Sequence, residues 1–256
     1  MNTTEYRAHP ALNFSTAKHL LKSPAHFKAA QQATHEPTKA MELGTLIHAI
    51  ALEGKSLTGM VNIRPEGINL ATKEGKAWKE SVDPAKPIIT ADDVEVIRVM
   101  NKSILENPHA QALLNGCQMR EMPLLASLKG IECKGLIDAA GTDGTDWVIA
   151  DLKTTQDASP REFASTVAKH HYDLQAAWYS ALLGQVHQIE EQPDFFWIVV
   201  EKTPPYTCIV YSATNWIMGG NDKLERVLDT YRECEAAKSW PQPHRGIINL
   251  EKPAWA

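Results

Sequence analysis

Apolar residues recur at helical spacing through the first part of the chain and predict helices there. Residues 39–53 place leucines and isoleucines three and four positions apart, and Gly54 is positioned to end the helix. Residues 91–108 repeat the pattern, with acidic residues at the start and a proline at the end. A shorter helix is expected from Ser15, a favoured N-cap residue, to just before Pro24, which cannot continue a helix.

The period of the pattern changes in the centre of the chain. Residues 119–128, 131–140 and 146–154 are short apolar-rich runs. Two turn-rich segments, 129–130 and 141–144, separate them. These runs predict a three-stranded antiparallel meander.

Helices and strands follow one another after the meander. A helical pattern begins at Ser159, the expected N-cap, and has a break around residues 170–172. Residues 194–202 and 206–212 are apolar runs that predict two further strands. A long polar helix from about residue 213 to residue 238 is expected to close the chain.

This order of elements predicts an α/β (α+β) fold, in which helices flank a mixed central sheet that contains the antiparallel meander. The chain has 256 residues, 43% of them hydrophobic, which is enough for one substantial core. We expect a single domain over residues 1–256. It would have a mainly helical part at 1–110, a sheet core at 118–212, and a C-terminal helix and tail at 213–256.

Charge, cysteine content and motifs limit the kinds of binding site that the chain can contain. The formal net charge is −5, with 26 basic against 31 acidic residues, so any DNA site must be a local basic patch. The cysteines show no C-x-x-C pair, which disfavours zinc-ribbon and iron–sulfur sites. No G-x-x-x-x-G-K-[ST] or G-x-G-x-x-G segment opens a helix after a strand, so a nucleotide cofactor has no motif to bind it.

The sequence shows neither an export signal nor a membrane span. The N-terminus lacks a basic segment followed by an apolar run, and no stretch approaches the roughly 18 apolar residues that a span needs. We therefore expect a cytoplasmic protein.

Two carboxylates and a lysine occupy the second and third strands of the predicted meander. Asp138 ends the segment Gly-Leu-Ile-Asp, and Asp151-Leu152-Lys153 lies on the next strand. Residues two apart on a strand point to one face, so Asp151 and Lys153 should lie together. Carboxylate oxygens suit Mg²⁺, and the ammonium of Lys153 could orient or deprotonate an attacking water, or offset charge in the transition state. An isolated D-x-K pair is common on strands, so the surrounding motifs must indicate whether this pair is catalytic.

That context resembles a nuclease superfamily. Asp138 followed by Asp151-x-Lys153 is similar to the D…(D/E)-x-K signature of PD-(D/E)XK nucleases. Gly44-x-x-x-His48 and Gln175-x-x-x-Tyr179 resemble the flanking motifs of the RecB-like branch. The segments HPALNFSTAKHLLKSPAHF, AMELGTLIHAIALEG and DLKTTQDASPREF together resemble the RecE (exonuclease VIII) type of nuclease domain.

The resemblance implies an activity and partners. RecE-type domains digest linear double-stranded DNA processively from 5′ to 3′, and leave a 3′ single strand for an annealing protein of the RecT type during recombination and repair. The family also implies a ring-shaped homo-oligomer, either a trimer or a tetramer, and Mg²⁺ as the cofactor, with Mn²⁺ as the alternative. Because the chain consists of little besides this domain, it is more like a compact phage or prophage version of the family.

The resemblance also assigns roles to residues at the centre of the site. Asp138 and Asp151 would be metal ligands, and the backbone carbonyl of Leu152 would be a further ligand. His48 would bind the metal or stand directly behind its ligands. Lys153 would be the catalytic cation.

Three more residues are expected to assist catalysis. Glu121, at the head of the first meander strand, matches an acidic position of this branch and would hold a second metal or position water. Gln175 and Tyr179 share a helix face, so they could hold a phosphate or sugar beside the scissile bond. The alternative for Tyr179 is a packed amphipathic aromatic residue.

A basic cluster lies outside these motifs. Lys73, Lys76 and Lys79 flank Trp78 on a segment that Gly75 makes less favourable for a helix. Such a cluster is usually a solvated face. The functional alternative is a DNA-binding segment, in which the lysines neutralise phosphates and Trp78 stacks on an end or a frayed base.

Two other functions stay open. One is a structure-specific or restriction-like endonuclease on the same fold. The other is a catalytically silent DNA-binding subunit of a recombination complex, although the retained Asp138, Asp151 and Lys153 argue against silence.

Overall fold

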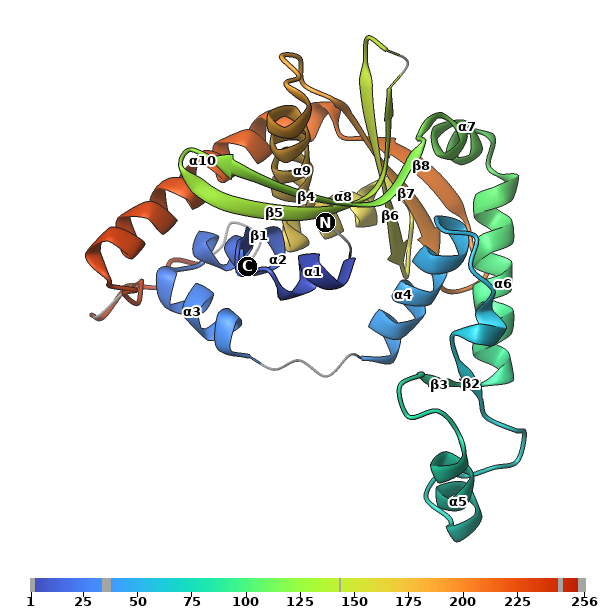
Figure 1. Cartoon of the computed structure of the whole chain (residues 1–256). Coiled ribbons are helices and arrows are strands. Elements are labelled where there is room, and N and C mark those ends of the chain that lie inside the picture. The colour runs from blue at the N-terminus through green and yellow to red at the C-terminus, as the bar shows by residue number, and fades with distance from the viewer. Residues whose placement is uncertain (1–2, 34–37, 143, 244–245, 253–256) are drawn as a thin grey trace.

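A mixed six-stranded sheet forms the centre of the computed structural model, which describes residues 3–33, 38–142, 144–243 and 246–252 (Figure 1). The strands follow the order β1-β5-β6-β7-β8, and β4 pairs with β5. Their bounds are β1 Leu12–Asn13, β4 Met119–Leu128, β5 Ile131–Thr142, β6 Trp147–Thr155, β7 Asp194–Glu201 and β8 Cys208–Ser212. A small second sheet pairs β2 Asn62–Ile63 with β3 Ile88–Ile89.

The predicted antiparallel meander is confirmed in β4, β5 and β6. β6 and β7 then run parallel, connected by α8 Pro160–His170 and α9 Tyr172–His187, and β8 returns antiparallel to β7. β1 adds a further parallel pairing to β5. The mixed sheet agrees with the predicted fold class. Asp143, in the second predicted turn, lies outside the described residues.

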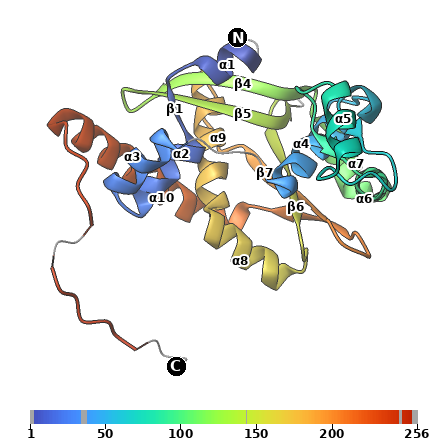
Figure 2. The same cartoon turned by 90° about the horizontal axis from the view of Figure 1, so that it is seen from below.

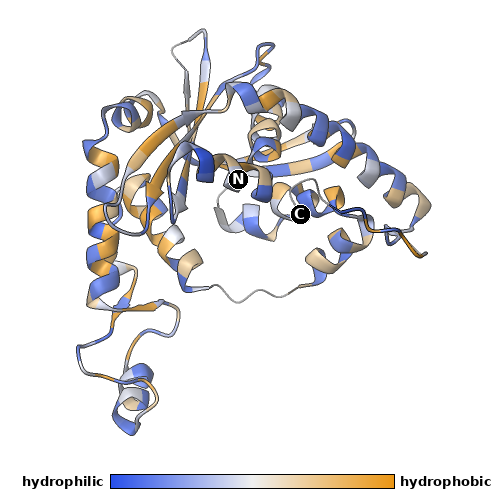
Figure 3. Cartoon of the chain, turned by 180° about the vertical axis from the view of Figure 1, so that it is seen from behind, coloured by the Kyte–Doolittle hydropathy of each residue, from blue (hydrophilic) through white to orange (hydrophobic). Residues whose placement is uncertain are grey.

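Helices cover both faces of the sheet, and each face has its own core. One core lies under α9 and α10 Thr214–Ala237, together with α2 Phe14–Ala17, the 3₁₀ helix η1 Lys18–Leu21 and α3 Pro24–Gln32. The other lies under α4 Lys39–Ala51, α6 Ala91–Glu106 and α7 Pro108–Gly116. Alternate strand residues point to opposite faces, so Trp197 enters the first core and Ile198 the second. Figure 3 shows the mixture of hydrophobic and hydrophilic residues along α6, which buries Ile97, Met100 and Ile104.

Two parts lie outside these layers. α5 Lys73–Ser81 projects beyond α4 and α6 with the small sheet, after the 3₁₀ helix η2 Leu57–Gly59 (Figure 1). α1 Thr3–Ala8 lies beside β4 and β5 (Figure 2). The Lys134 ammonium holds it by donating hydrogen bonds to the carbonyls of Tyr6 at 2.8 Å and His9 at 2.6 Å. Among the described residues, every helix is too short or too polar to cross a membrane.

Two helix ends differ from the prediction. The helix predicted from Ser15 begins at Phe14 as α2, and its cap is Asn13, because the Asn13 side chain accepts a 3.0 Å hydrogen bond from the backbone N–H of Thr16. Pro108 follows the end of α6, but it also begins α7, which the pattern did not predict. Proline suits the first turn of a helix, and Asn107 caps it by accepting from the N–H groups of the next turn.

Other ends agree with the prediction. α4 ends at Ala51, and Gly54 follows with a φ of 65°. The expected break between α8 and α9 falls at His171, which has a φ of 58°. Ser159 stands at the N-cap position of α8, but its side chain makes no capping hydrogen bond.

Candidate active site

Asp138 and Asp151 lie where two strands part. β5 and β6 pair antiparallel as far as Ala139 and Ala150, and these carboxylates occupy the next position on each strand. Beyond that point the backbone N–H of Leu152 donates a 2.8 Å hydrogen bond to Oδ2 of Asp138. The meander therefore brings together the two acidic positions that the sequence singled out.

Asp151 and Lys153 share a face of β6, as predicted. Asp151 is only 1% exposed, and its Oδ2 forms an ion pair with the ammonium of Lys153. The Lys153 nitrogen also lies 4.6 Å from the ring centroid of Tyr172, at the start of α9. A buried carboxylate thus holds the lysine in place, with an aromatic ring beside it.

His48, Glu121 and Asp138 form a compact cluster of potential metal ligands. Each offers one ligand atom, and these atoms lie within 4.8 Å of one another. The residues come from α4, β4 and β5, and Nδ1 of His48 is 3.4 Å from Oδ2 of Asp138. Asp151 stands outside this group of three. The carbonyl of Leu152 stays a predicted ligand.

Glu121 has an unusual backbone conformation. Its φ of 45° lies in the left-handed region, which residues other than glycine rarely adopt. The residues before and after it pair with Ala139 and Ile137, so Glu121 lies opposite Asp138. Strained residues cluster at functional sites, where the surrounding structure must hold them. The conformation therefore supports a functional role for Glu121.

His48 and Asp138 form a charge-stabilised pair. Burial of the His48 imidazole lowers its pKa, but the charge of Asp138 and the hydrogen bond to it raise the pKa more, to about 9. Burial raises the pKa of Asp138, yet the His48 and Lys153 charges outweigh it, and the pKa falls below its ordinary value. In the metal-free protein, His48 is an imidazolium at neutral pH.

The other acidic groups titrate nearer neutrality. Burial and the Asp138 charge raise the pKa of Glu121 to about 7. Burial raises the pKa of Asp151 to about 6, although Lys153 opposes the shift. Burial lowers the pKa of Lys153, but the Asp151 charge outweighs it and leaves the pKa above its ordinary value. Lys153 is therefore charged.

The cluster fits a divalent metal ion. Carboxylate oxygens are the ligands that Mg²⁺ prefers, and an imidazole nitrogen also suits transition metals. The raised pKa values of Glu121 and Asp151 show the cost of burying and crowding carboxylates without a cation. A divalent cation would remove that cost by inverting the local charge.

Gln175 and Tyr179 pack beside the carboxylates on one face of α9. Nε2 of Gln175 donates a 3.2 Å hydrogen bond to the hydroxyl of Tyr179, and Oε1 of Gln175 is buried without a partner. Burial, with the charges of Asp151 and Asp138, raises the pKa of Tyr179 well above its ordinary value. Tyr179 therefore lies within the electrostatic reach of the carboxylates, and the two residues share a helix face as their spacing predicted.

Sequence reasoning missed Gly135, which makes room for Tyr179. A Cβ at this position of β5 would come within 3.1 Å of the Tyr179 ring and within 2.8 Å of Leu182. A side chain at this position would force Leu182 and the Tyr179 ring to shift. The available signal was a glycine inside a predicted strand, which often marks a close approach.

Lys18 on η1 was also missed. Burial and the Lys153 charge lower its pKa, and its ammonium lies 5.4 Å from the ring centroid of Phe14. Lys18, Lys169 and Lys153 in turn act with burial to lower the pKa of His170. Lys18 and Lys153 are therefore close enough for their charges to act on each other. In the sequence, Lys18 is indistinguishable from a solvated helix lysine.

The basic cluster on α5 does not join the carboxylates. Lys73, Lys76 and Lys79 are exposed, and Trp78 is half-buried. Lys79 lines a groove of about 820 Å³ together with Arg7 and with Glu42 and Thr45 of α4. This groove connects the basic segment to the helix that carries His48.

Comparisons with known proteins place these features in a family. Residues 13–252 match the model of a family described as "PDDEXK-like domain of unknown function (DUF3799)". No curated protein matches the chain. A candidate exonuclease from Eubacterium rectale has 13% identity and a TM-score of 0.64, covering 99% of this chain and 95% of its own. A phage-related exonuclease from Haemophilus somnus 129PT has 13% identity and a TM-score of 0.35, covering 92% and 100%. The first similarity is one of fold.

Proposed function

The chain belongs to the PDDEXK-like domain family DUF3799, and on this basis we propose that it is a metal-dependent exonuclease acting on linear double-stranded DNA from its 5′ ends. The nuclease site carries the proposal. Asp138 and the pair Asp151 and Lys153 converge where β5 and β6 part. The fold shared with the candidate exonuclease from Eubacterium rectale supports cleavage that starts at DNA ends.

Hydrolysis would depend on a metal ion and a lysine held at fixed positions. His48, Glu121 and Asp138 would bind Mg²⁺ or Mn²⁺, with Asp151 and the carbonyl of Leu152 as further ligands. When bound, the ion supplies Lewis-acid stabilisation of charge on the phosphate oxygens. Lys153 keeps its proton because Asp151 stabilises the charge. Its ammonium would orient the attacking water and offset charge that develops on the phosphate.

Other residues would position the DNA strand. The amide of Gln175 and the hydroxyl of Tyr179 can donate to a phosphate or sugar oxygen next to the scissile bond. Lys18 would contact a neighbouring phosphate, since it has no ion-pair partner among the described residues. Farther from the scissile bond, the duplex would be held by the lysines of α5 and by the groove that Arg7 and Lys79 line.

The products and partners rest on the family resemblance. Digestion from 5′ ends would leave a 3′ single strand for an annealing protein of the RecT type, in recombination or repair. A ring-shaped homo-oligomer, trimer or tetramer, would enclose the DNA and keep digestion processive. A DNA substrate also agrees with the expected cytoplasmic location.

Closed circular DNA separates this proposal from its alternatives. We expect Mg²⁺ to support degradation of a linear duplex while a closed circle of the same sequence stays intact. Cutting of the circle would favour the restriction-like endonuclease. DNA binding with no cleavage under Mg²⁺ or Mn²⁺ would favour the silent subunit.

A further inference from the structure

Two aromatic rings connect Lys153 to the surface at the junction of α8 and α9. The Lys153 ammonium lies 4.6 Å from the centroid of the Tyr172 ring. The His170 ring stacks on the Tyr172 ring, with centroids 5.6 Å apart and an angle of 24° between the two planes. Tyr172 is half-buried and His170 is exposed. The two rings therefore form an aromatic step that begins at the nuclease site and ends in solvent.

The backbone at His171 brings the two rings together. Within one continuous helix, residues two positions apart do not face each other. His171 has a φ of 58°, in the left-handed region, and it separates α8 from α9. His170 is the last residue of α8 and Tyr172 is the first residue of α9, so the break between the helices lets their rings stack.

The aromatic step lies among cations. Burial lowers the pKa of His170, and the charges of Lys18, Lys169 and Lys153 lower it further. The imidazole of His170 is therefore neutral at neutral pH, although three ammonium groups act on it. A neutral flat ring can stack on a base, and ammonium groups nearby can bind the phosphates on either side of that base.

Rings and cations in this combination are typical of surfaces that bind unpaired nucleotides. Aromatic side chains stack on the faces of unpaired bases, whereas a base inside a duplex is already covered by its neighbours. A strand with its scissile phosphate at Lys153 would bring the adjacent base to Tyr172, because the ring and the ammonium are in contact. That base could reach the ring only after leaving its pair.

We propose that His170 and Tyr172 form a stacking site for an unpaired base of the strand that is being cleaved. This inference rests on the proposed nuclease function and adds a feature of the substrate that the carboxylates do not contact. A base stacked on Tyr172 would lie beside the Lys153 ammonium and align the scissile phosphate with it. The site would thus favour DNA ends that have already opened.

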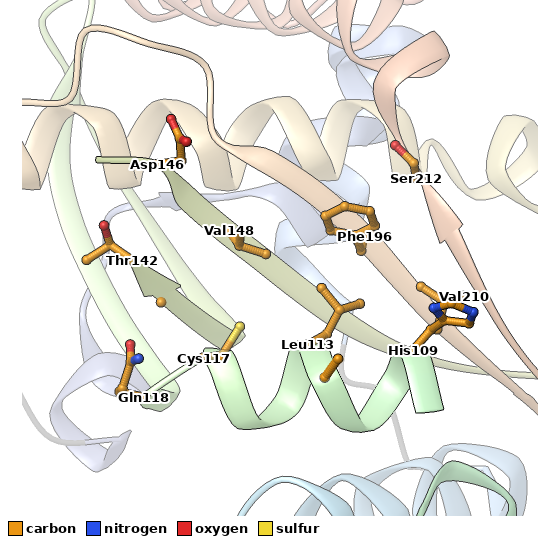
Figure 4. Close-up of a pocket in the computed structure, with 13 residues that line it drawn as sticks. His109, Leu113, Cys117, Gln118, Thr142, Asp146, Val148, Phe196, Val210 and Ser212 are labelled. Carbon is orange, nitrogen blue, oxygen red and sulfur yellow. The ribbon is translucent and has the colours of Figure 1, made fainter. Parts of the chain in front are cut away.

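An apolar pocket elsewhere in the molecule is the alternative place for a base. It encloses about 730 Å³ between α7 and the strands β5 to β8, and His109 and Phe196 supply its aromatic rings (Figure 4). No lysine or arginine of the described chain lines this pocket. A base bound there would leave its phosphates without a cation, so the aromatic step is the better site.

Binding of DNA that lacks a single base tests the proposal. The probe is a duplex with three mismatched pairs at one end, bound in EDTA, with an abasic nucleotide placed in turn at each unpaired position. For the wild type, loss of the stacked base should weaken binding at least about 5-fold, which is the size of one base stacked on an aromatic side chain. In His170→Ala and in Tyr172→Leu, the same abasic DNA should bind as tightly as the complete DNA.

Two control variants separate stacking from a structural effect. Tyr172→Phe keeps the ring and should retain the full effect of the missing base. His109→Ala removes another exposed histidine, at the apolar pocket, and should behave like the wild type. If circular dichroism shows that Tyr172→Leu is unfolded, His170→Ala alone decides, because His170 is exposed and its loss leaves the core intact.

Three results would overturn the stacking site. They are a wild type for which no abasic position weakens binding, a His170→Ala variant that is as sensitive to the missing base as the wild type, and loss of this sensitivity in His109→Ala. Hydrolysis of an intact linear duplex with Mg²⁺ is measured separately. A wild type that senses the missing base but leaves the duplex uncut would refute the nuclease proposal and support the stacking site, so the two failures can be told apart.

Discussion

Asp138 accepts a 2.8 Å hydrogen bond from the backbone N–H of Leu152, across the point where β5 and β6 stop pairing. The same carboxylate oxygen lies 3.4 Å from Nδ1 of His48. One side chain of the meander thereby connects the strand that carries Asp151 and Lys153 to the helix that carries His48. The geometry of the site depends on this junction.

Replacing Asp138 with Asn should return the pKa of His48 from about 9 toward its ordinary value. Burial lowers the pKa of this imidazole, and the charge of Asp138 and the hydrogen bond to it raise it more, so burial dominates once the charge is removed. An NMR titration of the ring protons in the metal-free protein measures the change, with His170 as the internal reference. A His48 pKa that stays near 9 in Asp138→Asn would contradict the pairing.

Metal affinity should increase as the pH rises from about 6 to about 9. The raised pKa values of Asp151, Glu121 and His48, about 6, 7 and 9, mean that the metal-free site holds protons that a cation must displace. Glu121→Gln removes one of these protons and should lower the number released. Titration calorimetry of metal binding, repeated in buffers of different ionisation enthalpy, measures the number of protons released. An affinity that does not change with pH would show that these groups are not ligands.

The triple variant Lys73→Ala/Lys76→Ala/Lys79→Ala should flatten the salt dependence of DNA binding. Each lost phosphate contact lowers the slope of log K against log salt by about 0.9, so the change should be at most about 2.7. Binding is measured in EDTA, which prevents cleavage.

The control for the α5 variant removes the same charge elsewhere. Lys102, Lys129 and Lys238 are each paired with a surface carboxylate, so changing them to Ala should leave the slope nearly unchanged. If both triple variants behave like the wild type, α5 is only a solvated face.

Asp93→Asn should destabilise the protein by about 1–2 kcal/mol at neutral pH. Asp93 accepts hydrogen bonds from the N–H and hydroxyl of Thr90 at 2.9 and 2.8 Å, and its other oxygen is 2.8 Å from the Lys39 ammonium. Burial raises the pKa of Asp93, but Lys39 and Thr90 outweigh burial and lower the pKa. Its contribution is therefore present above the ordinary carboxyl pKa and lost as the pH falls through the lower, folded value.

Urea unfolding at neutral and at acid pH measures this contribution. The difference between wild type and Asp93→Asn should shrink in acid. Asp92→Asn is the matched control, since Asp92 lies in the same helical turn but is exposed. If the two substitutions lowered the free energy of unfolding equally, the contacts of Asp93 with Thr90 and Lys39 would add no stability.

Sequence patterns predicted the parts of the site that depend on local spacing. The apolar-rich runs and the turns between them predicted the meander, and two-residue spacing placed Asp151 and Lys153 on one face. The family resemblance added Glu121 on the first meander strand, and His48, which comes from a helix that periodicity alone could not bring to the meander.

The remaining features depend on long-range packing. The parallel pairing of β6 with β7, the approach of Tyr179 to Gly135 and the electrostatic interaction of Lys18 with Lys153 each join segments far apart in the chain. No local pattern encodes such contacts. The strained backbone of Glu121 is likewise set by pairing on both sides of it, and its residue type gives no sign of it.

The most direct test of the nuclease site is digestion of a linear duplex, labelled separately at its 5′ and 3′ ends, by the wild type and by Lys153→Met. Lys223→Met, which breaks a similar buried pair with Asp173, is the control. We expect early release of the 5′ label with Mg²⁺, none with EDTA, and a rate at least about 100-fold lower in Lys153→Met alone. Undiminished digestion by folded Lys153→Met, or digestion in EDTA, would contradict the proposed nuclease site.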